Sequence, residues 1–105
     1  MGALPVRRFG RTELPMPLLS LGGMRFQQSW SDLPADRIQV DSQDNLRQLL
    51  ERAVELGFHH VETARHYGSS ERQLGALLQR VPDPARILQT KVPPQADAAA
   101  FEAEL

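Results

Sequence analysis

The spacing of hydrophobic and polar positions predicts two amphipathic helices in the middle of the chain. Between residues 46 and 54, apolar side chains recur every three or four positions, as on the buried face of a helix, and charged side chains stand between them. These apolar positions are Leu46, Leu49, Leu50, Ala53 and Val54. Asp41, Ser42 or Asp44 can cap the start of this helix, and Gly57 stands where a left-handed residue would end it.

The second predicted helix starts near Ser70. Ser70 and Gln73 have the spacing of a capping box, in which two side chains satisfy free backbone groups of the first turn. The apolar face of this helix consists of Leu74, Leu77, Leu78 and Val81. Prolines follow and end the helix. A third helix is expected over residues 98–105, with Asp97 as its N-cap.

Short apolar segments alternate with these helices and are predicted to be strands. They cover residues 18–21, 58–63 and 86–92. Ahead of them, extended pieces on either side of a turn at residues 10–12 predict a β-hairpin, whose second piece contains prolines and therefore belongs at a sheet edge. Residues 24–43 are mostly polar and predict a long loop, with a short helical turn near residues 35–38.

The alternation of strands and helices predicts an α/β fold with parallel strands and the helices outside. Such a small sheet has both edges open, and the last helix stops after about two turns without a cap. We therefore expect residues 1–105 to be one partial domain, the opening portion of a larger α/β domain that is cut within its third helix. The alternative is a complete, small, doubly wound binding domain.

Composition and charge narrow the possible functions. The chain has 12 Lys+Arg, 13 Asp+Glu and a formal net charge of -1, so no long-range field attracts nucleic acid or an anionic membrane. The absence of cysteine excludes disulfides, thiolate metal sites and cysteine nucleophiles. No apolar run could span a membrane and no signal segment is recognisable, so we expect a cytoplasmic protein. Lys91 is the only lysine, and Tyr67 is the only tyrosine.

Candidate chemistry gathers at the carboxyl ends of the predicted strands. Residues 22–24, 62–67 and 90–91 follow these strands, and in a parallel α/β barrel such ends lie on one face, where active sites form. The glycine-rich dinucleotide fingerprint, the P-loop and the HExxH zinc motif are absent. The chemistry of this predicted site therefore depends on individual side chains rather than on a phosphate-binding loop.

Glu62, Lys91 and Tyr67 form a coherent set within these segments. A carboxylate beside a lysine keeps the ammonium charged, and an ammonium beside a phenol favours the ionised form of the phenol. Such a phenol can donate a proton to a carbonyl oxygen as a general acid. Taken alone, each residue also has an ordinary structural explanation: solvation for Glu62 and Lys91, and packing for Tyr67.

Residues 57–71, which read GFHHVETARHYGSSE, resemble the signature of the aldo-keto reductase family. The hairpin turn at residues 9–12, the Gly-Gly end of the first strand and Thr90-Lys91 also fall in that family's order. The resemblance implies a (β/α)8 TIM barrel, of which the chain would hold the N-terminal hairpin, the first three strands, two helices and the start of the third helix. Residues 62–68 also resemble a bacterial branch of the family that carries a C-terminal ferredoxin-like extension.

The resemblance implies an oxidoreductase that reduces a small aldehyde or ketone with hydride from NADPH, or sometimes NADH. By motif position, Tyr67 matches the proton donor and Lys91 matches the lysine that assists it. Glu62 matches the carboxylate that pairs with this lysine near the nicotinamide ribose. Gly23 and Met24 match the first strand-end loop, which contacts cofactor and substrate.

Some features depart from the family pattern or invite a metal site. Glu62 replaces the usual aspartate and thereby shifts the carboxylate by roughly 1.5 Å, and the family's catalytic histidine would lie beyond Leu105. His59 and His60 should point to opposite faces of one strand, His59 under a helix and His60 into the barrel, so they cannot readily share a metal ion. His66 is expected near the mouth of the barrel. We expect no metal site.

Alternatives to a working reductase also remain open. The chain could be a catalytically inactive remnant, or a cofactor-sensing regulatory barrel subunit that binds a protein partner. A reading frame that continues to a strand-ending histidine supports the enzyme, whereas a native stop codon supports the remnant. A regulatory subunit would bind NADPH but turn over very slowly. In each case the isolated 105-residue chain is expected to be inactive.

Overall fold

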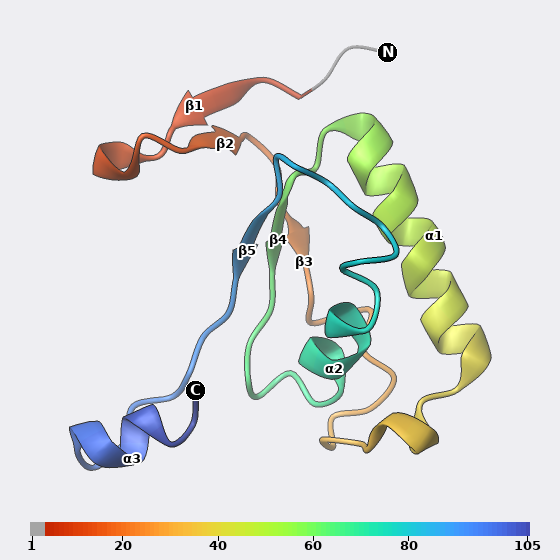
Figure 1. The fold of residues 1–105 in the computed structure, drawn as a ribbon, viewed down its shortest axis with the longest axis vertical. Helices are drawn as coiled ribbons and strands as arrows, with labels where there is room; N and C mark the ends of the chain where they lie inside the picture. Colours follow the sequence, from red (N-terminus) through yellow and green to blue (C-terminus); the bar gives the residue numbers. More distant parts are fainter. Residues whose placement is uncertain (1–3) are drawn as a thin grey trace.

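The chain is described by a computed structural model over residues 4–105 (Figure 1). Its elements are β1 (Val6–Arg8), η1 (Gly10–Thr12), β2 (Pro15–Pro17), β3 (Leu21–Gly22), η2 (Ala35–Arg37), α1 (Val40–Leu56), β4 (His60–Glu62), α2 (Ser70–Gly75), β5 (Ile87–Gln89) and α3 (Ala98–Glu102). The β1–β2 hairpin lies near the end of the sheet where the parallel strands begin. The long loop and α3 lie toward the end where these strands finish.

Strands β3, β4 and β5 form one parallel sheet in that order, which confirms the predicted parallel arrangement. Its pairing continues beyond the end of β4. The backbone N–H of Thr63 donates to the carbonyl of Gln89 (2.8 Å), and the N–H of Arg65 donates to the carbonyl of Lys91 (2.9 Å). The segments that follow β4 and β5 therefore run side by side. Over the described residues the sheet is open and does not close into a barrel.

The hydrophobic core lies between the sheet and helices α1 and α2. Its buried members are Leu46, Leu50, Val61, Leu74, Leu77 and Val81. Leu78 and Val54 are partly buried against this cluster, so most predicted apolar positions are confirmed. Leu49 differs, since it is 38 % exposed at the margin of the apolar face of α1.

The two ends of α1 compare differently with the sequence prediction. Gly57 ends the helix with φ 88°, and its N–H donates to the carbonyls of Ala53 and Val54, as expected for a left-handed cap. The predicted N-caps are wrong, because the helix begins one residue before Asp41, with Gln39 as N-cap and no side-chain cap. Asp44, well inside the helix, accepts hydrogen bonds from Arg47 instead.

The predicted capping box at the start of α2 is also wrong. Ser70 is already helical, and its hydroxyl is hydrogen-bonded to the hydroxyl of Thr63 (2.6 Å). Ser69 is the N-cap, with no side-chain cap bond of its own. The helix ends at Gly75 rather than at Val81, although the apolar stripe continues, because the next residues form tighter turns with i→i+3 hydrogen bonds.

The first predicted parallel strand starts later than expected. Leu18 is 54 % exposed, and its N–H donates to the carbonyl of Pro5 (3.0 Å), so it extends the hairpin rather than the parallel sheet. The hairpin itself is confirmed, with β1 and β2 antiparallel. The short turn expected within the long loop is confirmed as η2. Asp97 caps α3 as predicted, because its side chain accepts from the N–H of Ala100 (2.8 Å).

Within residues 4–105, none of the helices combines the length and the hydropathy that a membrane span needs.

Candidate active site

Two charged residues meet at the carboxyl end of the parallel sheet. Glu62 is the last residue of β4 and pairs in register with Gln89 of β5. Lys91 lies two residues beyond Gln89, so the alternation of side chains along a strand places it on the same face of the sheet as Glu62. The ammonium of Lys91 donates to the carboxylate of Glu62. The predicted pair is therefore present.

Tyr67 joins this pair through the turn that follows β4. The Nζ atom of Lys91 lies 4.9 Å from the centroid of the Tyr67 ring, which is within the range of a cation–π contact. The turn is closed by hydrogen bonds on both sides, from the N–H of Tyr67 to the carbonyl of Ala64 (3.1 Å) and from the N–H of Ser70 to the carbonyl of Tyr67 (3.0 Å). The structure thus brings together Tyr67, the predicted proton donor, and Lys91 and Glu62, which are predicted to assist it.

The environment of Lys91 favours its charged form. The hydrogen bond that Lys91 donates to Glu62 is the main cause that raises the pKa of Lys91 above its ordinary value of 10.5; desolvation opposes this effect, and Tyr67 adds to it. A raised pKa means that the contact stabilises the folded chain fully below pH 10.5. This contribution is lost as the pH rises through the raised pKa of Lys91.

We expect the substitution Glu62→Gln to lower the pKa of Lys91 toward 10.5, because it removes the strongest contact that favours the ammonium. The measurement is an NMR titration of the Lys91 side chain, whose signal is unambiguous because the chain has one lysine. Tyr67→Phe is the matched control, and it should lower this pKa by less. An unchanged pKa of Lys91 in the Glu62→Gln variant would show that the ion pair does not form.

Gly23 is buried directly against Glu62. Its N–H donates to Oε1 of Glu62 (3.4 Å), and a Cβ added to Gly23 would lie 2.7 Å from the carbonyl oxygen of Glu62 and 2.9 Å from Oγ of Ser70. Any larger residue would therefore push β3 and β4 apart. Met24 follows in the same turn and is half-buried. The glycine predicted from the first strand end thus lies at the site, as expected.

Sequence reasoning missed the contribution of Thr63. Its backbone carbonyl accepts a second hydrogen bond from Nζ of Lys91 (2.9 Å), and its hydroxyl is bonded to Ser70 in the first turn of α2. The ammonium is therefore held between a side chain and the main chain. A main-chain carbonyl is present in every residue, so the identity of Thr63 does not indicate this contact. The strand register, which places Lys91 beside Thr63, could have indicated it.

The three histidines have separate surroundings. His60 is buried and is hydrogen-bonded to Ser20 and to Gln89 (3.0 Å), on the face of the sheet that carries Glu62. His59 is bonded through Nδ1 to the nearly buried carboxylate of Asp83 (2.7 Å). These opposite directions agree with the prediction for a strand. Across residues 4–105, no cluster of three histidine or acidic side chains is arranged to hold a metal ion.

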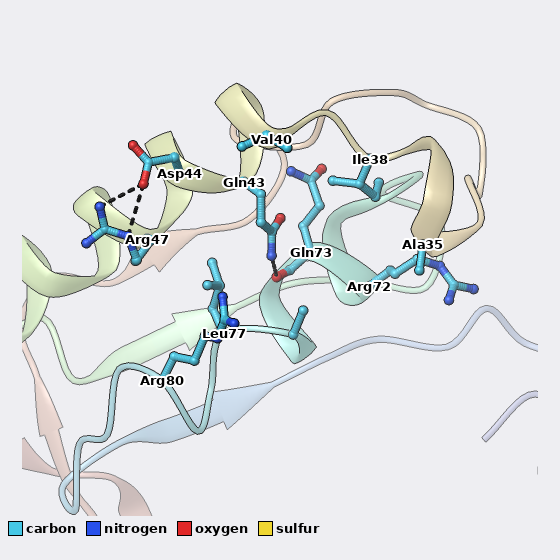
Figure 2. Close-up of a pocket in the computed structure, with 11 residues that line it drawn as sticks. Ala35, Ile38, Val40, Gln43, Asp44, Arg47, Arg72, Gln73, Leu77 and Arg80 are labelled. Carbon is cyan, nitrogen blue, oxygen red and sulfur yellow. Dashed lines mark hydrogen bonds and ion pairs between the residues drawn. The ribbon is translucent and has the colours of Figure 1, made fainter.

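Cavities that do not contact the Glu62–Lys91 pair also occur among residues 4–105. One, with a volume of about 330 Å³, is a groove between α1 and α2, with Gln73 and Arg80 among its walls (Figure 2). Another, of about 340 Å³, is lined by Trp30 and His66, together with neighbouring polar side chains. His66 therefore borders a hollow, and its expected place near the mouth of a barrel stays a prediction.

Comparison with known protein families gave one match. A model described as the aldo/keto reductase family matches residues 18–104. The matched segment begins after the hairpin and includes every residue of the site described above. Neither the curated proteins nor the solved structures compared with the chain gave a match. Because the family model covers most of its length, the chain belongs to the aldo/keto reductase family.

Proposed function

From membership of the aldo/keto reductase family, we infer that the chain is part of an NAD(P)H-dependent oxidoreductase that reduces a small aldehyde or ketone to an alcohol. The observation that carries this proposal is the meeting of Glu62, Lys91 and Tyr67 at the carboxyl end of the sheet. Family membership supports oxidoreductase chemistry in general, and these three side chains supply the groups that protonate the oxygen of a carbonyl.

The proposed proton donor is the hydroxyl of Tyr67. When a carbonyl carbon accepts hydride, its oxygen becomes an alkoxide and needs a proton, which a phenol held nearby can give as a general acid. The positive charge of Lys91 stabilises the phenolate that remains after the transfer. Glu62 and the carbonyl of Thr63 hold that charge in place, because both accept hydrogen bonds from it.

The residues present fit one end of a nicotinamide dinucleotide. That group would supply the hydride. The absence of a side chain at Gly22 leaves space beside the carboxylate of Glu62, since a Cβ there would lie 3.7 Å from Oε1, at ordinary van der Waals distance. Glu62 would accept a hydrogen bond from a ribose hydroxyl, and the Gly23–Met24 turn would contact the ring. NADPH is the proposed cofactor, with NADH as the alternative.

We further propose that residues 1–105 form the first part of a (β/α)8 barrel. Family membership supports this arrangement. So does the sheet, in which β3, β4 and β5 are parallel, follow the order of the chain and leave both edges open. Later strands would then complete the cofactor site and add further catalytic groups. The cytoplasmic location and the small carbonyl partner stay predictions.

The test is consumption of NADPH with a set of aldehydes and ketones, measured for the protein that carries this chain. Carbonyl-dependent oxidation of NADPH supports the reductase. Binding of NADPH with very slow turnover on every carbonyl supports the regulatory subunit instead. Absence of both NADPH binding and turnover would contradict the proposal and favour an inactive remnant.

A further inference from the structure

The side chain of Gln73 joins three segments that are distant in the sequence. It belongs to α2 and is 1 % exposed. Its Nε2 group donates to the hydroxyl of Ser42 in α1 (3.1 Å). Its backbone carbonyl accepts from the side chain of Gln43 (2.7 Å), as Figure 2 shows. Its Oε1 atom accepts from the backbone N–H of Gln28 in the long loop (2.7 Å). A buried amide whose nitrogen and oxygen both have hydrogen-bond partners favours one arrangement of those partners.

The long loop is tied to α2 mainly through the Oε1 atom of Gln73 and the hydroxyl of Ser69. The Ser69 hydroxyl donates to Oε1 (2.8 Å). The oxygen of the same hydroxyl accepts from the N–H groups of Gln28 and Ser29 (both 3.2 Å). Since Ser69 is completely buried, water cannot replace these bonds without opening the loop.

This tie lies directly beside the turn that carries Tyr67. The N–H of Ser69 donates to the carbonyl of Ser29 (2.9 Å), and Gly68 has φ +54° with the loop so close that a Cβ would lie 1.9 Å from the same carbonyl oxygen. The loop therefore packs on Gly68, the residue next to Tyr67. The loop also begins at the Gly23–Met24 turn, so its position fixes both sides of the candidate site.

We propose that Gln73 is a positioning residue of the reductase site, whose side-chain carbonyl holds the long loop after β3 against the Tyr67 turn. The proposal rests on the proposed function for its catalytic consequence, but the tie itself does not depend on it. Gln73 acts at a distance, through Gln28 and Ser69, and contacts none of the groups that transfer the proton.

Two substitutions distinguish the role of Gln73 as a hydrogen-bond acceptor from its role in filling space. Gln73→Met fills nearly the same volume but offers no strong acceptor to Gln28 and Ser69. Gln73→Glu keeps the acceptor oxygen for both groups. Because burial strongly disfavours a charge at this position, exchange is measured at a pH low enough to protonate the new carboxyl, whose O–H then donates to the Ser42 hydroxyl as Nε2 does. If Gln73 acts only by packing, the loop should stay attached in the methionine variant. If it acts as a hydrogen-bond acceptor, the loop should stay attached in the glutamate variant.

The measurement is amide hydrogen exchange of the 105-residue chain by NMR. In Gln73→Met, the amide of Gln28 is expected to exchange about tenfold faster, as follows from the loss of its hydrogen bond to Oε1. The amide of Ser69, which donates to the carbonyl of Ser29, should also exchange faster, because that carbonyl belongs to the released loop. In Gln73→Glu they should exchange close to the wild-type rate. The amide of Phe58, which donates to Ala53 at the end of α1, serves as reference and should be unchanged in both.

Some results of the exchange experiment would contradict the proposal. Equal exchange in Gln73→Met and the wild type, or equal loosening in both variants, would overturn the proposal. If the methionine variant unfolds, as faster exchange at Phe58 would reveal, Ser69→Ala replaces it. This variant leaves Oε1 of Gln73 as the acceptor of the Gln28 N–H, so fast exchange of the Gln28 amide would overturn the proposal.

A catalytic readout separates this inference from the proposed function. In an active reductase, Gln73→Met should lower kcat more than it raises KM, because the loosened loop no longer holds the turn that carries Tyr67, and Gln73→Glu should restore kcat. The pKa of Lys91 should not change in either variant, because Glu62 and Thr63 remain in place. Exchange that responds as expected in a protein without reductase activity would refute the function and leave only the structural tie between Gln73 and the loop.

Discussion

Tyr67→Phe is expected to lower kcat for carbonyl reduction by about 10²–10⁴-fold, the usual contribution of one general acid. The substitution removes the only phenolic hydroxyl of the chain and keeps the ring that packs beside Lys91. Binding of NADPH should be retained, because the Gly23–Glu62 contact is untouched. The measurements are steady-state consumption of NADPH with an aldehyde and titration of NADPH binding by fluorescence.

His66→Gln is the matched control for this experiment. His66 is adjacent in sequence and exposed, and it borders the neighbouring hollow rather than the ammonium of Lys91. Its replacement should leave kcat within a small factor of the wild-type value. Near-normal turnover of Tyr67→Phe would remove Tyr67 from the proposed mechanism, and an equal loss in both variants would point to a disturbed turn rather than to a missing proton donor.

Leu50→Ala is expected to destabilise the chain by about 2–5 kcal/mol, the usual cost of truncating a fully buried leucine. Leu50 is 1 % exposed and belongs to the cluster that holds α1 and α2 on the sheet. Leu49→Ala, one position earlier on the same helix, removes the same atoms from a site that is 38 % exposed. It should change stability by only about 0.5 kcal/mol.

The measurement is unfolding by urea, followed by circular dichroism, for both variants and the wild type. Because both substitutions introduce alanine into α1, helix propensity cancels and the difference reports burial alone. Similar losses of stability at the two positions would show that α1 does not pack on the sheet through the face seen in the structure. The comparison thus tests the packing of α1 directly.

The charged pair of the candidate site was predictable because it follows from local rules. The order of strands and helices predicts parallel strands, and parallel strands bring their carboxyl ends together. Glu62 and Lys91 follow such ends, so their meeting needs no detailed knowledge of packing. The apolar face of α1 was predictable for a similar reason, since its period is a property of one helix.

The contacts that sequence reasoning missed all depend on partners far away in the chain. The spacing of Gln73 from Ser70 predicts a capping box, but the hydrogen-bond partners of its side chain include residues of the long loop and of α1. Leu18 has the residue type of a buried strand, but it pairs with Pro5 in the hairpin. In both cases a segment outside the local pattern supplies the hydrogen-bond partner, and a pattern within a few residues cannot identify that segment.

The face of the sheet that carries the Glu62–Lys91 pair is accessible to water over the described residues, with 45 % of the Lys91 side chain and 26 % of the Glu62 side chain exposed. Dissolved ions screen charges over a Debye length of about 8 Å at physiological ionic strength. The attraction within the pair should therefore weaken as salt is added. A surface that closes over this face would lower the local dielectric constant and remove that dependence. Sensitivity of the Lys91 titration to ionic strength is consequently a gauge of how completely the site is enclosed.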